Sequence, residues 1–320
     1  MSEKRGCLGC SFPLAAGILL VFVVLFALGF AAGPLGKSIF GDLGLPGWLS
    51  VSRPDPRLPA ETVFHLFGFP IANSIIAAWI TIVVLVGLSY AVTHRMRLIP
   101  ARLQAVFEAF LGWLYDLCRE VAGEENGRRF FPMVATIFLF VAFNAWLSLL
   151  PGFGSLFVIG PEGGHVDLLR GANTDINMPL ALALVSFIFV EYFGLRSGGV
   201  RYLGKFVNVG KFITGAGQIA RGRLRAGLGG LVTGVIDIFV GILETLSELV
   251  RIVSFTFRLF GNMTAGEMLL LIAIFLVPWV FALPFYGLEL LVGFVQALIF
   301  GGLTLVFLTV ATAPHGAEAA

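Results

Sequence analysis

The chain has 320 residues, of which 58% are hydrophobic and only 12% are charged, with a net charge of +2. Its mean hydropathy is +0.95. A soluble globular domain carries about 25% charged residues, so this composition excludes that class and indicates a polytopic membrane protein. No GxxxxGK[ST] sequence is present, so we expect no nucleotide site. We also expect no metal, no other cofactor and no nucleic-acid partner.

The N-terminal part, residues 1–64, is expected to form an apolar span followed by a loop on the outer side. The apolar stretch 12–32 follows Lys4 and Arg5 and ends in small residues. It could be a cleaved signal peptide or a retained anchor, and its length of about 20 residues favours the anchor. The pair Cys7 and Cys10 has metal or redox spacing, but a single such pair is a weak signal.

Six stretches are apolar and long enough to cross a bilayer as helices, which takes about 20 residues. The expected spans are 12–32, 71–93, 132–150, 177–195, 231–277 and 281–312. The fifth is too long for a perpendicular crossing, because about 45 residues reach ~70 Å. It must tilt strongly or bend, with Gly241 and Gly261 as candidate bends or close helix contacts. The predicted fold is therefore all-α, with two long tilted helices forming a C-terminal hairpin.

The charges of the loops predict the orientation. Basic residues crowd the segments 95–129 and 196–225, which we place in the cytoplasm. Both termini are then also cytoplasmic if the first span is retained. Within the first segment, residues 100–121 mix charged and large apolar side chains, which predicts an amphipathic helix at the inner surface. Residues 197–230 are rich in Gly and Arg, which predicts a flexible loop.

Arg258 is the most informative residue of the chain. It lies within the long fifth span, where a guanidinium that cannot lose its proton costs about 3 kcal/mol or more. No carboxylate lies three or four residues away on either side, so a local ion pair does not account for it. Arg258 therefore indicates a functional charge.

Other polar residues of the same helix share one narrow face with Arg258, within about 80° of it. They are Asp237, Glu244, Glu248, Arg251 and Asn262. A structural interpretation, in which Glu248 and Arg251 form a local pair near the inner interface, is strong for those two residues. In the last span, Glu289 and Gln296 stack on one face, two turns apart.

Acidic residues lie on both sides of Arg258 along the helix axis. Glu244 is about 21 Å toward the cytoplasm and Glu267 about 13 Å toward the outside, by helix rise. Glu267 falls about 180° away from Arg258, on the opposite helix face. One continuous pore would expose these groups on a single face. Two offset half-pathways separated by a positive charge fit this placement better.

The run Arg258-Leu-Phe-Gly-Asn262-Met-Thr-Ala-Gly-Glu267 resembles the signature of subunit a of F-type ATP synthases. Segments around Asn144, at 174–183 and at 296–300 resemble other parts of that family. The resemblance covers about 65–312 and implies a subunit a membrane domain of about five helices over 65–320. It further implies a multi-pass protein of the bacterial energy-coupling membrane. The implied partners are the c-ring, peripheral-stalk subunit b, the rest of the complex and lipid.

The resemblance also implies roles for individual residues in a proton-translocating stator subunit that is not itself catalytic. Arg258 would face the c-ring and discharge its carboxylate, while Glu267 and Glu244 would serve the outer and inner half-channels. Some members of the family carry histidine at the position of Glu289 in this chain. A glutamate at that position would still relay protons. The remaining candidate polar positions are Asn262, Gln296, Ser254 and Asn144.

Two other interpretations stay open. A stand-alone transporter or channel would often show an internal repeat, and none is visible between the two halves. A membrane scaffold would use its charges only to pair helices. The sequence leaves both H⁺ and Na⁺ open as the transported ion.

Overall fold

The computed structural model describes residues 12–41, 43–54, 59–94, 96, 102–150, 152–154, 156–159, 165–206, 210–220 and 224–313. Within these ranges six helices are long and apolar enough to cross a membrane, which confirms the all-α polytopic fold. Cys7 and Cys10 lie outside the described residues.

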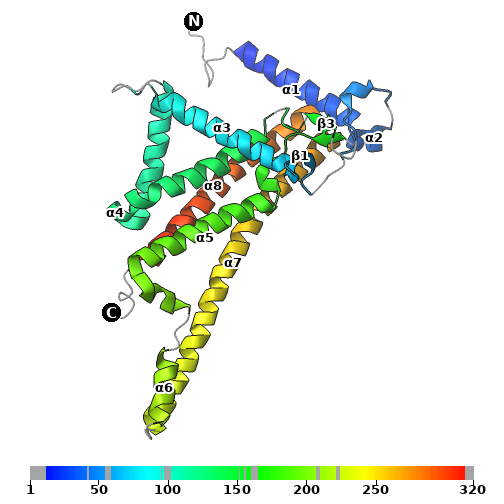
Figure 1. Cartoon of the computed structure of the whole chain (residues 1–320). Helices are drawn as coiled ribbons and strands as arrows, with labels where there is room; N and C mark the ends of the chain where they lie inside the picture. Colours follow the sequence, from blue (N-terminus) through cyan, green and yellow to red (C-terminus); the bar gives the residue numbers. More distant parts are fainter. Residues whose placement is uncertain are drawn as a thin grey trace.

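Eight α-helices form the described chain (Figure 1). They are α1 Phe12–Ala32, α2 Pro34–Phe40, α3 Asn73–Thr93, α4 Arg102–Ser148, α5 Asn177–Gly198, α6 Gly210–Ala220, α7 Leu224–Leu276 and α8 Leu283–Thr312. Four short 3-10 turns join them: η1 Gly47–Leu49, η2 Ala172–Thr174, η3 Gly199–Lys205 and η4 Trp279–Ala282. The predicted spans recur as α1, α3, the second part of α4, α5, α7 and α8.

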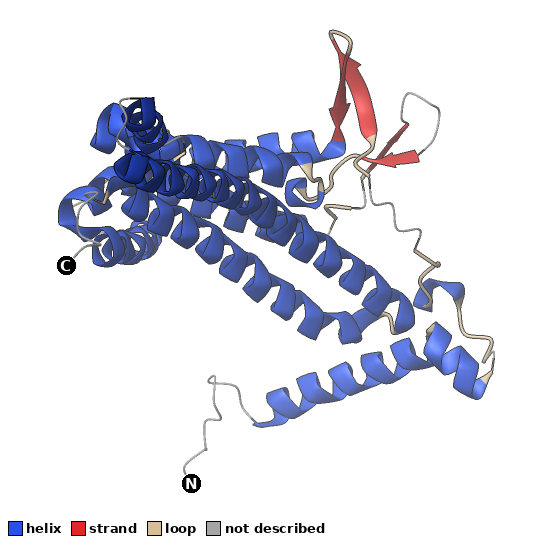
Figure 2. Ribbon diagram, turned by 90° about the horizontal axis from the view of Figure 1, so that it is seen from below, coloured by secondary structure: helices blue, strands red, loops and turns tan. Residues whose placement is uncertain are grey.

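Two small antiparallel hairpins project from one end of the helix bundle (Figure 2). They are β1 Thr62–Leu66 with β2 Phe69–Ala72, and β3 Phe157–Ile159 with β4 His165–Asp167. The β1–β2 turn uses Phe67 and Gly68, both with positive φ, which suits a two-residue hairpin. These hairpins were not predicted, because strands of three to five residues carry too little periodicity to be recognised in a sequence.

The helix α4 contains two arms that meet at Gly123, whose φ of 78° breaks the helical backbone. The first arm corresponds to the predicted amphipathic helix at the inner surface, and the second to the predicted third span. The arms also pack together, since the ring centroids of Phe110 and Phe138 are 5.5 Å apart. Figure 1 shows the first arm turned steeply against the second.

The core lies among the second arm of α4, α5, α7 and α8. Small residues permit close contact: a Cβ on Gly293 of α8 would lie 2.8 Å from Ala145 Cβ of α4. Aromatic rings also pack in the core. The ring centroids of Phe255 of α7 and Phe300 of α8 are 4.8 Å apart. Leu259 is fully buried there. This packing fixes which face of α7 points away from the bundle.

The long helix α7 is continuous over 53 residues and runs obliquely across the other spans (Figure 1). The helix is therefore slanted relative to the neighbouring spans, as a strongly tilted helix would be. Gly241 is a close helix contact, since a Cβ there would lie 2.4 Å from the carbonyl oxygen of Phe206. A Cβ on Gly261 would meet no atom within 4 Å, so Gly261 makes no close helix contact within the described chain.

The prediction of a flexible loop at 197–230 was wrong for its described residues. They form η3, α6 and the first turns of α7, and α6 packs along α7 as a helical hairpin beyond the bundle (Figure 1). A Cβ on Gly234 would lie 2.5 Å from the Phe212 backbone, so the two helices touch through glycine. High glycine content here permits helix contact rather than disorder.

The N-terminal helix α1 contacts the turn between α7 and α8 through its C-terminal end. Cβ atoms on Gly29 and Gly33 would each lie 2.3 Å from a backbone oxygen, of Pro278 and Leu276 respectively. The rest of α1 exposes its apolar side chains. The helix is thus attached at one end only within the described chain.

Candidate functional site

Arg258 lies on a face of α7 that no described part of the chain covers. Its side chain is exposed and has no ion pair or hydrogen bond among the described residues. Asn262, one turn further on, is exposed on the same side, and so is Ser254, one turn before. Phe255 and Leu259, about 60° and 100° around the helix from Arg258, are buried against the bundle. A polar strip centred on a permanent charge therefore faces outward.

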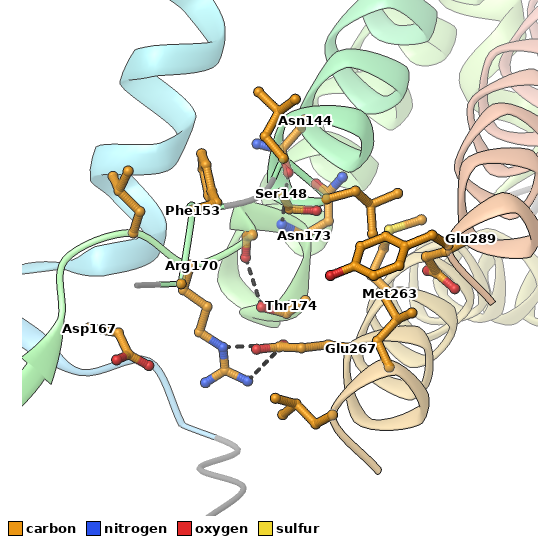
Figure 3. A pocket seen from close by; sticks show the side chains of 18 of the residues that line it. Asn144, Ser148, Phe153, Asp167, Arg170, Asn173, Thr174, Met263, Glu267 and Glu289 are labelled. Carbon is orange, nitrogen blue, oxygen red and sulfur yellow. Dashed lines mark hydrogen bonds and ion pairs between the residues drawn. The ribbon is translucent and has the colours of Figure 1, made fainter. Parts of the chain in front are cut away.

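A polar pocket of about 290 Å³ lies on the other side of α7, toward its C-terminal end (Figure 3). Glu267 of α7 and Glu289 of α8 both line it, so the structure brings these two predicted residues together. Asn144 of α4 lines the same pocket. Further polar lining comes from Ser148, Asp167, Arg170, Asn173, Thr174 and Tyr286.

Arg170 is the basic residue that lines this pocket, and it was not predicted from the sequence. Its Nη2 lies 3.2 Å from Oε2 of Glu267, and its Nη1 donates to the carbonyl oxygen of Pro59 at 3.1 Å. The arginine side chain is only 8% exposed, against 33% for the glutamate. No motif pointed to it, because its partner Glu267 is 97 residues away in the sequence.

Glu289 is buried against α7, with only 6% of the residue exposed. A Cβ added to Gly266 would lie 2.0 Å from its Oε1, so the absence of a side chain at 266 makes room for this carboxyl group. No Lys, Arg or His in the described chain forms an ion pair with Glu289. The two carboxyl groups of the pocket thus have opposite surroundings, one paired with a cation and the other not.

Asn144 connects three elements at the inner wall of the pocket. Its Nδ2 donates to Thr81 Oγ1 of α3 at 3.0 Å, and its Oδ1 accepts from the backbone N–H of Asn173 at 3.3 Å. The side chain of Asn173 is buried, and both its polar atoms lack a hydrogen-bond partner among the described residues. A pocket lined by unsatisfied amide groups has the polarity that water needs.

Gln296 of α8 is buried, two turns beyond Glu289 along the helix. Both residues belong to the buried side of α8, as their predicted stacking requires. Gln296 does not line the pocket. It is packed instead within the helix bundle that also buries Ala297 and Phe300.

The predicted polar face of α7 is divided in the structure. Glu248 and Arg251 are turned into the bundle, where Arg251 Nη1 forms a close ion pair of 2.6 Å with Glu248 Oε2. This contact confirms the structural interpretation of those two residues. The Arg251 guanidinium also lies 3.6 Å from the ring centroid of Phe307, a cation–π contact. Glu244 remains half-buried on α7.

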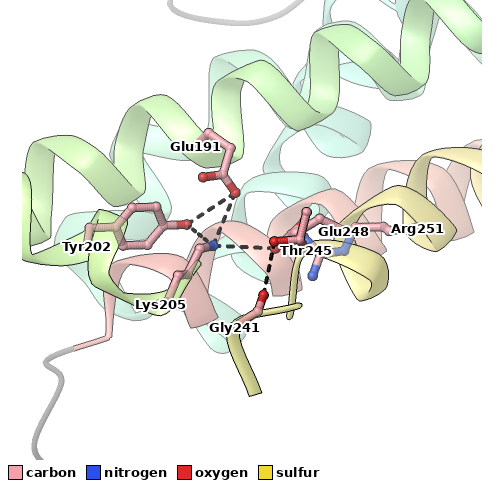
Figure 4. A network of polar contacts seen from close by, with 7 residues as sticks. All are labelled: Glu191, Tyr202, Lys205, Gly241, Thr245, Glu248 and Arg251. Carbon is pink, nitrogen blue, oxygen red and sulfur yellow. Dashed lines mark hydrogen bonds and ion pairs between the residues drawn. The ribbon is translucent and has the colours of Figure 1, made fainter. Parts of the chain in front are cut away.

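Lys205 of η3 links this pair to α5 (Figure 4). Its Nζ lies 3.4 Å from Glu248 Oε1, 3.2 Å from Glu191 Oε1 and 2.6 Å from the hydroxyl of Tyr202. Burial raises the pKa of Tyr202, against the lowering effect of Lys205. Burial lowers the pKa of Lys205, but the contacts with Tyr202 and Glu191 outweigh it and leave the pKa raised.

The described residues hold no group of three or more His, Cys, Asp or Glu side chains that could bind a metal ion. What the geometry offers is a set of carboxyl groups, hydroxyls and amides along α7. Along α7 the exposed Arg258 lies between the pocket at Glu267 and the polar cluster at Glu248. Such a chain of protonatable groups within membrane-spanning helices is typical of an ion pathway.

Comparison with known proteins decides the family. The ATP synthase A chain family matches residues 75–309. The chain belongs to the ATP synthase A chain family. It is 31% identical over 252 residues to the ATP synthase subunit a of Nitratiruptor sp., covering 78% of this chain and 92% of that one. It is 29% identical over 259 residues to that of Moorella thermoacetica, covering 81% and 97%.

Membership of the ATP synthase A chain family makes this chain a component of the membrane sector of ATP synthase. It is a multi-pass protein of a bacterial energy-coupling membrane that takes part in ion transport for ATP synthesis. The subunit a of Gloeobacter violaceus is similar as well, at 31% identity over 243 residues, 76% of this chain and 85% of that one. The matched range contains every candidate residue from Asn144 to Gln296.

Proposed function

We propose that this chain is the proton-translocating stator subunit of the membrane sector, in which Arg258 faces the carboxyl groups of a rotating c-ring. The observation that carries the proposal is an exposed arginine on a membrane-spanning helix without a partner among the described residues. A guanidinium in that position is too costly to face lipid, so a partner surface with a carboxylate must cover it. Asn262 and Ser254 flank it on the same surface.

The pocket at Glu267 and Glu289 supports an outer half-pathway. It lies on the bundle side of α7, while Arg258 points away from the bundle, about 13 Å along the axis. Asn144 and Asn173 supply hydrogen-bonding groups for water in this pocket. A proton that enters from the outer side therefore meets two carboxyl groups before it reaches the ring surface.

The half-buried Glu244 supports an inner half-pathway. It lies about 21 Å from Arg258 on the side of the basic loop, by helix rise. Arg251 and Glu248 neutralise each other between the two residues, which leaves Glu244 as the acid nearer the cytoplasm. Because Glu244 and Glu267 lie at different depths and on different faces, the two pathways are offset and are bridged only by the ring.

The mechanism follows from the charge of Arg258. A ring carboxyl group is neutral while it faces lipid and becomes ionised beside an opposite charge. Its proton leaves by one half-pathway and another proton arrives by the other. Arg258 repels protons and cannot relay one, so it prevents direct leakage between the pathways. A membrane potential supplies about 2.3 kcal/mol per charge per 100 mV, which drives the rotation.

Assembly with other subunits is part of the proposal. The c-ring would cover the Arg258 face of α7, and peripheral-stalk subunit b would hold the chain against rotation. Residues 65–320 would form the membrane domain, and residues 1–64 an N-terminal anchor with an outer loop. The exposed apolar residues of α1 fit lipid contact, as a retained anchor requires.

The test is ATP-driven proton pumping by membrane vesicles that carry Arg258→Ala. We expect the complex to assemble and hydrolyse ATP but to pump no protons. Arg258→Lys should also fail largely, because lysine can lose its proton and lacks the planar guanidinium. Wild-type pumping by Arg258→Ala would overturn the proposal.

A further inference from the structure

We propose that Arg170 is a positioning residue of the outer half-pathway, and that it holds the Glu267 carboxylate so that protons pass between Glu267 and Glu289. This inference rests on the proposed function. It adds a second arginine to the pathway, on a segment outside the membrane-spanning helices (Figure 3).

The contacts of Arg170 fix one oxygen of Glu267 and leave the other available. Both Nε and Nη2 of Arg170 donate to Oε2, at 3.4 and 3.2 Å. The Oε1 atom of Glu267 has no partner in the described chain, although it belongs to a residue that lines the pocket. A guanidinium that grips one oxygen through two nitrogens sets the orientation of the whole carboxylate. Oε1 is therefore the atom at which a proton can be gained and lost.

Arg170 is itself held in place when Glu267 becomes neutral. Its Nη1 donates to the carbonyl oxygen of Pro59, which is independent of the protonation of Glu267. The neighbouring backbone is fixed on both sides of the arginine. Asn73 Nδ2 donates to the carbonyl oxygen of Asp167 at 3.2 Å, and the N–H of Asn173 donates to Asn144 at 3.3 Å. Anchored in this way, Arg170 can orient Glu267 and keep its own position when Glu267 changes its protonation state.

Glu289 is placed to be the second proton carrier of the pocket, next to Glu267. Its carboxyl group lies against the backbone of Gly266, the residue immediately before Glu267 in α7. Within the described chain it has no basic partner, so nothing there keeps it in its ionised form. Glu267 is thus paired with a cation, whereas Glu289 is not. Such different surroundings of two carboxyl groups separate a proton acceptor from a proton donor. The step breaks one O–H bond as another forms, directly or through water, and needs no co-reactant.

The decisive experiment is a double-mutant cycle on the whole complex in membrane vesicles. Passive proton conductance is measured after the soluble catalytic part is removed, for Arg170→Gln, Glu267→Gln and the double variant. We expect Arg170→Gln to lower conductance about tenfold, as misplacement of a reacting group does. In the Glu267→Gln background the same change should have no further effect, because Arg170 acts through Glu267. Arg170→Lys should restore part of the loss.

Three results would overturn the inference. Equal loss from Arg170→Gln in both backgrounds, with less subunit recovered in the purified complex, would show that Arg170 only holds the outer segment together. If Glu267→Gln lowers conductance but Arg170→Gln leaves it normal, the role of Arg170 is overturned and the role of Glu267 is not. Normal conductance of Glu267→Gln would remove the outer pathway of the proposed function as well.

A second variant pair tests the position of Glu289 without touching an ionisable group. In Gly266→Ala the new methyl group must displace the Glu289 carboxyl tip, which a flexible side chain can do without disturbing the fold. We expect conductance to fall about tenfold with normal assembly. Gly287→Ala is the control, because a Cβ there meets nothing within 4 Å. Equal conductance of the two variants would contradict the placement.

Discussion

The Nζ of Lys205 lies 3.4 Å from Oε1 of Glu248, and this ion pair joins η3 to α7 across 43 residues of chain. Glu191 of α5 shares the same ammonium group at 3.2 Å. Lysine at this position therefore neutralises two largely buried carboxylates from two helices, while Arg251 supplies the second cation for Glu248. The end of the bundle at η3 therefore depends on a balanced set of charges.

We expect Lys205→Met to destabilise this end of the subunit by about 3 kcal/mol, because removal of one partner leaves buried charge uncompensated. Thermal unfolding of the purified complex measures the effect, together with the amount of subunit retained. Addition of Glu191→Gln should recover part of the loss. A Lys205→Met complex as stable as the wild type would contradict this account.

The same network predicts a dependence on alkaline pH. Because the pKa of Lys205 is raised above its ordinary value of 10.5, its stabilisation is fully present below that pH. It is lost as the pH rises through the raised value. The difference in thermal stability between wild type and Lys205→Met should therefore be constant from pH 7 to 9 and shrink in strongly alkaline buffer. A difference that grows with pH would contradict the sign.

Gly241→Ala should destabilise the contact between α7 and η3 by about 2 kcal/mol, since overpacking forces backbone to move. The new Cβ would lie 2.4 Å from the Phe206 carbonyl oxygen, which is backbone and cannot swing away. Thermal unfolding of the complex is again the measurement. Gly229→Ala in the same helix is the control, because it meets nothing within 4 Å and should be neutral. Equal stability of the two variants would disprove the contact.

Glu244→Gln should slow proton conductance through the stripped membrane sector by about threefold without uncoupling the complex. In the proposed inner half-pathway this carboxylate would concentrate cations, and water can replace a surface relay. Glu244→Lys should be slower still, because it repels the ion. Complete loss of conductance in Glu244→Gln, or no change in Glu244→Lys, would refute this role of Glu244.

Cysteines introduced at Glu267 and Glu289 should react with a small water-soluble thiol reagent from the outer side. The background lacks the three native cysteines. Leu259→Cys, in the fully buried core, is the control and should stay unlabelled. Labelling of positions 267 and 289 only from the cytoplasmic side would reverse the proposed sidedness.

The spans could be predicted because each is a long apolar segment, and a bilayer fixes the length that such a segment needs. Arg258 could be singled out for the same reason, since a charge within such a segment is costly. The family signature then located the residues around it. These features depend only on residues close together in the sequence, so they could be recognised without knowledge of the tertiary contacts.

Features that depend on distant contacts could not be predicted. Arg170 meets Glu267 only after the chain folds, and nothing in its own segment marks it. The glycines between 197 and 230 suggested a loop, but Gly234 lets α6 pack on α7 and so permits a helical hairpin. The polar face of α7 was predicted as one unit, whereas packing turned Glu248 and Arg251 inward and left Arg258 exposed.

The central claim is that the face of α7 around Arg258 contacts the c-ring, and disulfide cross-linking tests it most directly. Ser254→Cys and Asn262→Cys are each combined with a cysteine one helical turn from the ring carboxylate, in the cysteine-free background. Val83→Cys, which is 69% exposed on α3, is the matched control. The account predicts oxidative cross-links to the ring from positions 254 and 262 and none from 83. Cross-links from position 83, with none from 254 or 262, would contradict it.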